Sequence, residues 1–270
     1  MPRSDPHPDP APCRGRAQIG EPLTAPHRPK QMQSSRALWS ILASLLALAA
    51  APARATDSHD YAKDEYAIIR DGLAPDKRVS LASHADPEAE GDGQGHNFHV
   101  WLMAEPAHRK SAPLDDIGSS NNLDTGPDAY HAFWSADSRR VAVSFRSDRH
   151  TLELNLYQIE NRRAHPISGP SLFKEVTSRD VGSHDDLRRS EPEIEWSGPR
   201  RFVLREHRLF LTSDPGFARL LGAYGKVTDK LDDGRLLVEF SAEADCVLMP
   251  GDRYRIVDLR AGKFGDPGSW

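Results

Sequence analysis

Apolar side chains alternate with small or polar ones over several stretches, and this period of two restricts the fold more than any other feature. In the stretch 141–146, Val141, Val143 and Phe145 alternate with smaller or polar residues. The same period returns in 152–156, 202–204, 209–211 and 253–259. Successive side chains of a strand point to opposite faces, so the pattern predicts half-buried strands. We therefore expect an all-β fold, with helices only in the short segments 58–65 and 215–221.

A short repeat links these stretches: a turn rich in Asp, Pro, Gly or Ser, then a basic residue, then an apolar strand. Its fullest copy is 134–143 (WSADSRRVAV), and further copies lie at 194–204, 74–81 and 232–238. An Asp side chain in such a turn caps backbone N–H groups, and a Trp beside it fills the space between neighbouring sheets. The residues assigned to the structural repeat are Trp134, Asp137, Trp196, Asp76 and Asp233.

The segment around Trp134 resembles the repeat of TolB-like periplasmic β-propellers, W-S-P-D-G-K/R-R followed by an apolar residue. Ala136 stands where that pattern has Pro, and Ser138 where it has Gly. The resemblance implies a β-propeller-like domain of up-and-down antiparallel four-stranded blades, with Trp134 and Trp196 largely buried between adjacent sheets. One blade would comprise the strands 130–134, 139–146, 151–159 and 164–167. At about 40–45 residues per blade, the domain would hold about five blades at most. The sequence leaves open whether the propeller is closed, incomplete or irregular.

The first 55 residues fall into two segments of different composition. Residues 1–31 hold eight of the 21 prolines, and a stretch with so few large apolar side chains is expected to be disordered. They are either a Pro-rich leader or a mis-assigned start upstream of Met32. Residues 32–55 have the pattern of a secretory signal peptide, with Arg36, the apolar run 37–51 and small residues at its exit. The apolar run is shorter than the ~20 residues that cross a bilayer as a helix.

This pattern predicts an exported protein. We expect cleavage near Ala55, a mature chain that begins at Thr56, and a single β-propeller-like domain over 56–270 in the periplasm or outside the cell. Membrane contact is expected only through the signal peptide during export. With 35 Lys and Arg against 40 Asp and Glu, the net charge is −5, which provides no basic patch for nucleic acid. Cys246 would be alone in the mature chain and could form no internal disulfide.

Two groups of side chains are candidates for binding a metal ion. The histidine pair at 96 and 99 is the tightest, but residues three apart on a strand point to opposite faces. The acidic loop 86–93 is similar to a calcium loop in composition, yet it lacks the spacing of an EF-hand. We expect no cofactor, and calcium is the one ion that the acidic loops could hold. The candidate ligands are Asp86, Glu88, Asp92, Asp124, His96 and His99.

No motif in the sequence joins a nucleophile to a base, since G-x-S-x-G and the glycine-rich phosphate loops do not occur. We therefore expect a non-enzymatic binding or scaffold protein whose partner is a protein or another component of the cell envelope. One alternative is a propeller-type hydrolase or lyase with a polar site at the channel mouth, with His131, Asp128 and His99 as candidates. The other is a calcium-dependent β-sandwich domain for adhesion or carbohydrate binding, which would use the acidic loops.

Overall fold

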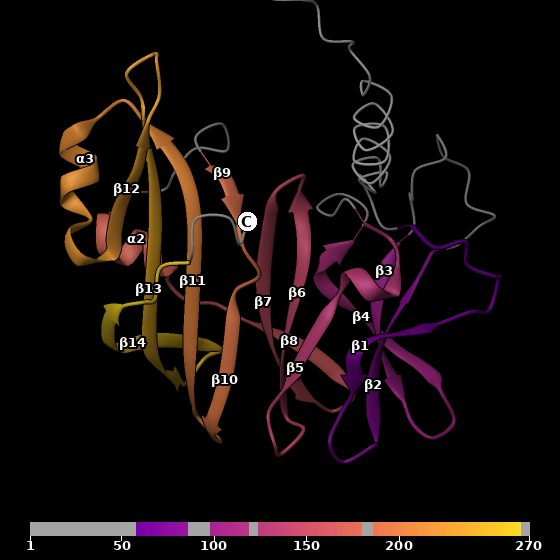
Figure 1. Cartoon of the computed structure of the whole chain (residues 1–270). Coiled ribbons are helices and arrows are strands. Elements are labelled where there is room, and N and C mark those ends of the chain that lie inside the picture. Colours follow the sequence, from indigo (N-terminus) through magenta and orange to yellow (C-terminus); the bar gives the residue numbers. More distant parts are fainter. Residues whose placement is uncertain (1–57, 86–97, 119–123, 180–185, 266–270) are drawn as a thin grey trace, which may run out of the picture. The chain divides into compact units, whose positions relative to one another are not determined.

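The computed structural model describes residues 58–85, 98–118, 124–179 and 186–265, all of which belong to the compact unit Arg54–Trp270. These residues form mostly strands, so the expected all-β fold is confirmed. The strands join into one mixed sheet that does not close on itself (Figure 1). Three antiparallel meanders make up this sheet, and they are described in turn.

The first meander follows the order of the chain, with each strand antiparallel to the next. Its strands are β1 (Ala67–Leu73), β2 (Val79–His84), β3 (His99–Ala104) and β4 (Arg109–Gly118). The segment 58–65, where we expected a short helix, contains only a turn at Lys63 and Asp64. Here the Glu65 carboxylate accepts a hydrogen bond from Ala62 N, 2.9 Å away, and lies 2.8 Å from the ring of His59. The side chain thereby satisfies a backbone group that a helix would need.

The second meander has the same up-and-down order. Its strands are β5 (His131–Trp134), β6 (Arg140–Asp148), β7 (Thr151–Glu160) and β8 (Arg163–Ile167). The four predicted strands 130–134, 139–146, 151–159 and 164–167 are confirmed, with ends that differ by no more than two residues. The local pattern of turns and alternation was sufficient to place them.

The third meander is longer and carries an insertion. Its strands are β10 (Glu193–Gly198), β11 (Arg201–Thr212), β13 (Leu236–Met249) and β14 (Arg253–Ala261). The predicted strands 202–204 and 209–211 are parts of the single strand β11, which pairs with β13 from Arg201 to Thr212. A short strand, β9 (Asp186–Arg189), also pairs with β11.

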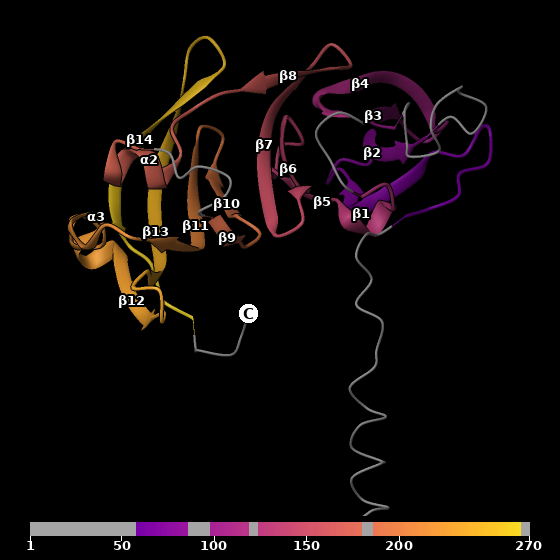
Figure 2. The same ribbon diagram turned by 90° about the horizontal axis from the view of Figure 1, so that it is seen from above.

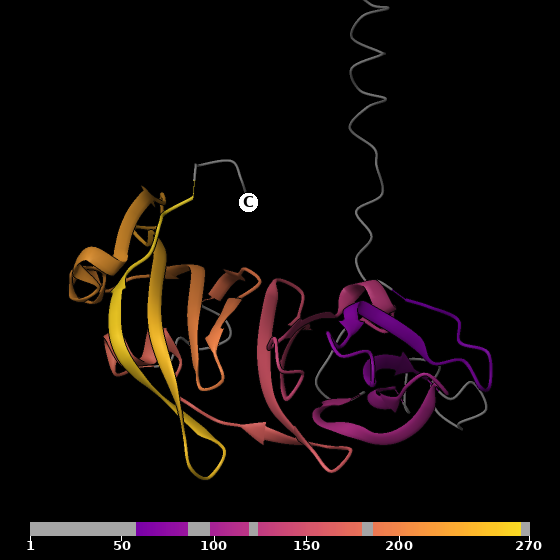
Figure 3. The same ribbon diagram turned by 90° about the horizontal axis from the view of Figure 1, so that it is seen from below.

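The insertion between β11 and β13 contains α3 (Pro215–Leu220), the 3-10 turn η2 (Gly222–Tyr224) and β12 (Gly225–Lys230), which pairs with β13 (Figure 3). The predicted helix at 215–221 is therefore confirmed. A further helix, α2 (Leu172–Thr177), was not predicted from the sequence. The Ser171 side chain caps it by accepting a hydrogen bond from Lys174 N. A 3-10 turn, η1 (Pro127–Ala129), precedes β5.

The meanders are linked by sparse pairing and by two apolar cores. One parallel pair, Arg70 with His131, joins β1 to β5, and another, Thr151 with Arg189, joins β7 to β9. One core lies between the first and second meanders, and the other lies between the second and third. The second meander therefore lies between its two neighbours (Figure 2).

Strand β6 shows the consequence of this double packing. Val141 and Val143 belong to the core shared with the first meander, whereas Ala142 belongs to the core shared with the third. All three are fully buried, and Ser144 is 2% exposed. The prediction of a half-buried strand is thus wrong for β6, because a neighbouring sheet covers each of its faces. Burying a Val or Leu side chain contributes about 1.5–3 kcal/mol, so both cores depend on this strand.

The repeat corresponds to the same tight turn at three places, each followed by a strand. In each turn an Asp carboxylate accepts a hydrogen bond from the backbone N–H two residues further on, at 2.9, 3.2 and 3.0 Å. The residue directly after each Asp has a positive φ, which is 57° at Lys77, 57° at Ser138 and 85° at Gly234. This conformation suits Gly and strains other residues. The aspartates are Asp76, Asp137 and Asp233, and the residues that follow them are Lys77, Ser138 and Gly234.

The two tryptophans of the repeat make equivalent contacts. Trp134 Nε1 donates to Gly72 O at 3.2 Å, and Trp196 Nε1 donates to Phe133 O at 3.0 Å. Each indole thus bonds to a strand of the preceding meander. Both side chains are of intermediate exposure, and each packs against one of the two cores. The indoles lie across the seam between meanders, bonded to the backbone, and this leaves part of each ring in solvent.

We expect Trp134→Ala to lower the free energy of unfolding by about 3 kcal/mol, because it removes both the ring packing and the hydrogen bond. Trp134→Phe keeps most of the packing and should cost about 1 kcal/mol for the lost bond to Gly72. Urea unfolding of the two variants measures the difference. An unchanged midpoint in Trp134→Ala would mean that this seam does not hold the first two meanders together.

Candidate functional site

Four of the predicted metal ligands, Asp86, Glu88, Asp92 and His96, lie outside the described residues. Asp124 and His99 are described, and each has its own neighbours. Asp124 is buried and lies 3.2 Å from Arg146 Nε, so a cationic side chain already faces its carboxylate. His99 packs against Trp101, and burial lowers the pKa of its imidazole. In the described part of the chain, no group of three or more His, Cys, Asp or Glu side chains is placed to hold a metal ion.

His131 has partners other than those expected for a catalytic site. Its ring nitrogens lie 2.9 Å from Asp71 Oδ2 and 3.0 Å from Glu191 Oε1. Asp128, the candidate partner, is exposed in η1, and His99 lies on β3. The buried Ser144 donates its hydroxyl to the same Glu191 carboxylate. Because both ring nitrogens are engaged, His131 connects the first, second and third meanders rather than offering a free base.

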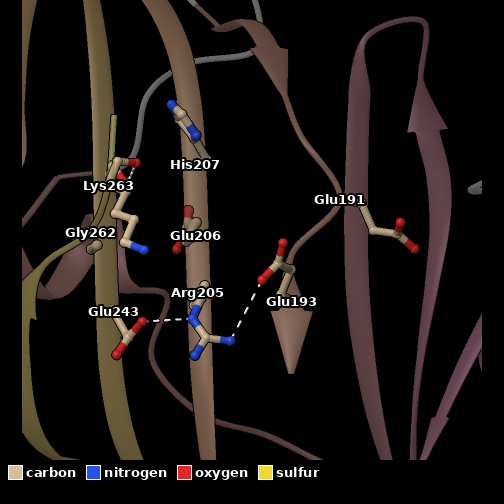
Figure 4. A pocket seen from close by; sticks show the side chains of 10 residues that line it. Glu191, Glu193, Arg205, Glu206, His207, Glu243, Gly262 and Lys263 are labelled. Atoms are coloured by element: carbon tan, nitrogen blue, oxygen red, sulfur yellow. Dashed lines mark hydrogen bonds and ion pairs between the residues drawn. The ribbon is translucent and has the colours of Figure 1, made fainter. Parts of the chain in front are cut away.

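The most developed surface feature is a groove of about 420 Å³ on one face of the third meander. Glu193 pairs with Arg205 across β10 and β11, and Arg205 pairs with Glu243 across β11 and β13. Residues of odd number in these strands therefore share this face, while the even ones contribute to the core. Figure 4 shows the groove, which is lined by charged side chains and ends at Lys263.

Arg205 is the centre of the ion pairs on this face. Its Nε donates to Glu243 Oε2 at 2.6 Å, and its terminal nitrogens lie 3.3 Å from Glu195 and 3.6 Å from Glu193. The bond from Arg205 lowers the pKa of the Glu243 carboxyl, which burial opposes and Arg260 reinforces. The cluster therefore keeps Glu243 ionised and fixes both side chains in place.

Arg260 extends the network to the edge of the sheet. It bonds to Glu243 and lies 2.9 Å from Asp245 and 3.1 Å from Asp258. We call this surface the acidic face. Around the groove six carboxylates lie near the cations Arg205, Arg260 and Lys263, so the balance there is negative. The carboxylates are those of Glu193, Glu195, Glu239, Glu243, Asp245 and Asp258. The strand register places further cations on the same face: Arg201, Arg253 and Arg255 towards the β13–β14 turn, and Lys226 opposite Glu239.

Two of the carboxylates in and around the groove are buried and serve the fold. Glu239, 2% exposed, accepts hydrogen bonds from Gly265 N at 2.7 Å and lies 2.9 Å from His207 Nε2. Glu206 points to the other side of β11, where it accepts bonds from the first backbone N–H groups of α2 and from Arg208. A buried carboxylate needs such partners, so these two acids position the C-terminal segment and α2.

The groove is lined mainly by charged side chains. Its hydroxyl group, on Ser241, donates to Lys263 O at 2.8 Å. Glu193 and Glu195 are each 68% exposed, so their carboxylates reach solvent as well as Arg205. Sequence reasoning missed this face because its charged residues form no motif. The alternation of β11 and β13 pointed to strands, but the cross-strand partners depend on the register.

Comparison with known protein families, with curated proteins and with solved structures finds no match to this chain. None of the helices in the described segments has the length and apolarity that a membrane span requires.

His207 makes the stability of the acidic face dependent on pH. Burial lowers the pKa of its imidazole below the ordinary value of 6.5, although Glu239 opposes the shift. As the pH falls, His207 therefore binds a proton in the unfolded chain before it does so in the folded chain. The free energy of unfolding decreases from about pH 6.5 down to the lower pKa of the folded state. We expect His207→Gln to reduce this loss.

The measurement is urea unfolding of the wild type and of His207→Gln at pH values above and below 6.5. The exposed His150 provides a matched control, because His150→Gln makes the same substitution at a position outside the cores. Equal loss of stability in the wild type and in His207→Gln would show that this imidazole is not buried as the structure has it.

Proposed function

We propose that this chain is an exported, non-enzymatic binding or scaffold protein of propeller-like architecture, and that the acidic face is its binding surface. Export is supported by the signal-peptide pattern of residues 32–55, which lie outside the described residues. The propeller-like assignment is supported by three antiparallel meanders with four-stranded cores, and by the Asp turn found in the first two meanders and again before β13.

The observation that carries the proposal is the groove on the acidic face. Its size of about 420 Å³ falls within the range of ligand pockets, about 300–1,000 Å³, but such pockets are mainly apolar. This groove is lined by charged side chains fixed in ion pairs, and these suit a polar, cationic segment of a protein or envelope component. Because the side chains are already ordered by Arg205 and Arg260, binding would cost little side-chain entropy.

The alternative of a propeller-type hydrolase or lyase has less support. It would need an imidazole or carboxylate that is free to exchange a proton with substrate. His131, its first candidate, has a carboxylate at each ring nitrogen. The alternative of a calcium-dependent sandwich would use the two acidic loops, 86–93 and 115–128. The first lies outside the described residues, and in the second the Asp124 carboxylate already faces Arg146.

A peptide-binding experiment tests the proposed function. A labelled oligolysine peptide should bind, measured by fluorescence anisotropy, and the affinity should fall at high ionic strength because exposed charges are screened. An oligoglutamate peptide should not bind. We expect the double variant Glu193→Gln and Glu195→Gln to weaken oligolysine binding about fivefold, which corresponds to roughly 1 kcal/mol.

A matched control removes two carboxylates elsewhere. Glu175 on α2 and Glu160 at the end of β7 are exposed and lie off the acidic face. Glu175→Gln with Glu160→Gln changes the net charge by the same amount and should leave binding unchanged. Equal weakening in both double variants would contradict the proposal, because the peptide would then respond only to net charge.

A further inference from the structure

The described residues leave two sheet faces without a covering sheet. The second meander is covered on both sides, by the first and by the third. The outer face of the third meander is the acidic face. The outer face of the first meander lies on the other side of its strands from the shared core, and its composition differs from that of the acidic face.

Pairing between strands defines this second surface. Ile68 pairs with Ala82, and Ala82 pairs with Trp101, so these residues share one face. Leu73 pairs with Ser80, two residues before Ala82, and Lys110 pairs with Met103, two residues after Trp101, so both also lie on this face. Arg70 is exposed in the irregular part of β1 between Ile68 and Leu73, beside this face. We call the surface formed by Ile68, Leu73, Trp101 and Lys110, with Arg70 beside it, the aromatic face.

The aromatic face exposes apolar and cationic groups together. Ile68 is 46% exposed and Leu73 is 44% exposed. The ammonium group of Lys110 lies 4.6 Å from the centre of the Trp101 ring. Trp101 Nε1 is buried and has no hydrogen-bond partner among the residues that the structure describes. Exposed apolar side chains beside an unsatisfied N–H are typical of a surface that meets a partner.

We propose that the aromatic face of one copy of this chain docks on the acidic face of a second copy. The inference rests on the proposed function, and it names the partner of the acidic face. Charge complementarity supports it, because Arg70 and Lys110 would meet the exposed carboxylates of Glu193 and Glu195. This contact joins an aromatic face to an acidic face, so each copy can make two such contacts, one through each of its two faces.

The areas of the two faces favour a dimer in which both faces of each copy are buried over a dimer with only one face-to-face contact. A four-stranded sheet with six residues per strand presents roughly 19 by 20 Å, about 400 Å². Stable interfaces bury about 800 Å² on each partner, so one contact is too small. When two copies make both contacts, the area on each copy reaches about that value. The pair then contains about six four-stranded sheets, a number within the four to eight blades of closed propellers.

Two charge-reversed variants test this arrangement. The first carries Glu193→Lys and Glu195→Lys, and the second carries Arg70→Glu and Lys110→Glu. In the first variant both faces become basic, and in the second both become acidic, so each variant alone should be monomeric. An equal mixture restores complementary contacts at both interfaces and should form a dimer. Light scattering coupled to size-exclusion chromatography gives the mass in each case.

For the wild type we expect a mass of twice the monomer, falling to one monomer at high ionic strength. Recovery of the dimer in the mixture shows that the variants are folded. A monomeric wild type at every concentration, a mass above two copies, or a dimer that persists in both variants would overturn the inference. If the wild type is monomeric but Glu193→Gln with Glu195→Gln still weakens oligolysine binding, the proposed function stands and this partner is wrong.

Discussion

The fold depends on burial of the second meander from both sides. Val141 and Val143 pack toward the first meander, while Ala142 and Leu156 pack toward the third. A strand of this kind has no polar face to present to water, so it is stable only between two covering sheets. Strand β11 of the third meander alternates instead from Arg201 to Phe210, with buried even residues and at least partly exposed odd ones. This difference explains why charged side chains gather on the outer face of the third meander and not on β6.

Local features of the fold were predictable from the sequence, and features set by neighbouring sheets were not. The strands of the second meander and the Asp turns depend on residues within about ten positions of each other, such as Asp137 and the N–H of Arg139. The burial of Ala142 and Ser144 depends on sheets far away in the chain, so alternation indicated the wrong exposure for one face. The tryptophans were assigned to the repeat, but their partners Gly72 and Phe133 lie in the preceding meander, 62 and 63 residues away.

The same distinction applies to the candidate site. His131 was among the candidate residues, but its partners Asp71 and Glu191 each lie 60 residues away and belong to no motif. The acidic face was not predicted at all, because it arises from the register of β11 on β13, which brings Arg205 opposite Glu243. Charges that are separate in the sequence become one surface only when the strands pair. Charge and shape on this face are the physical basis of the binding function that we propose.

Native-state hydrogen exchange tests the central role of the second meander most directly, because it measures the opening free energy of each amide. The account predicts that the amides of Val141, Val143 and Tyr157 exchange only through global unfolding, with the free energy obtained from urea denaturation. Amides of the exposed strand β12 should exchange through smaller openings. Exchange of the β6 amides at a much lower free energy than those of β11 and β13 would contradict the account, since the third meander would then be stable without the second.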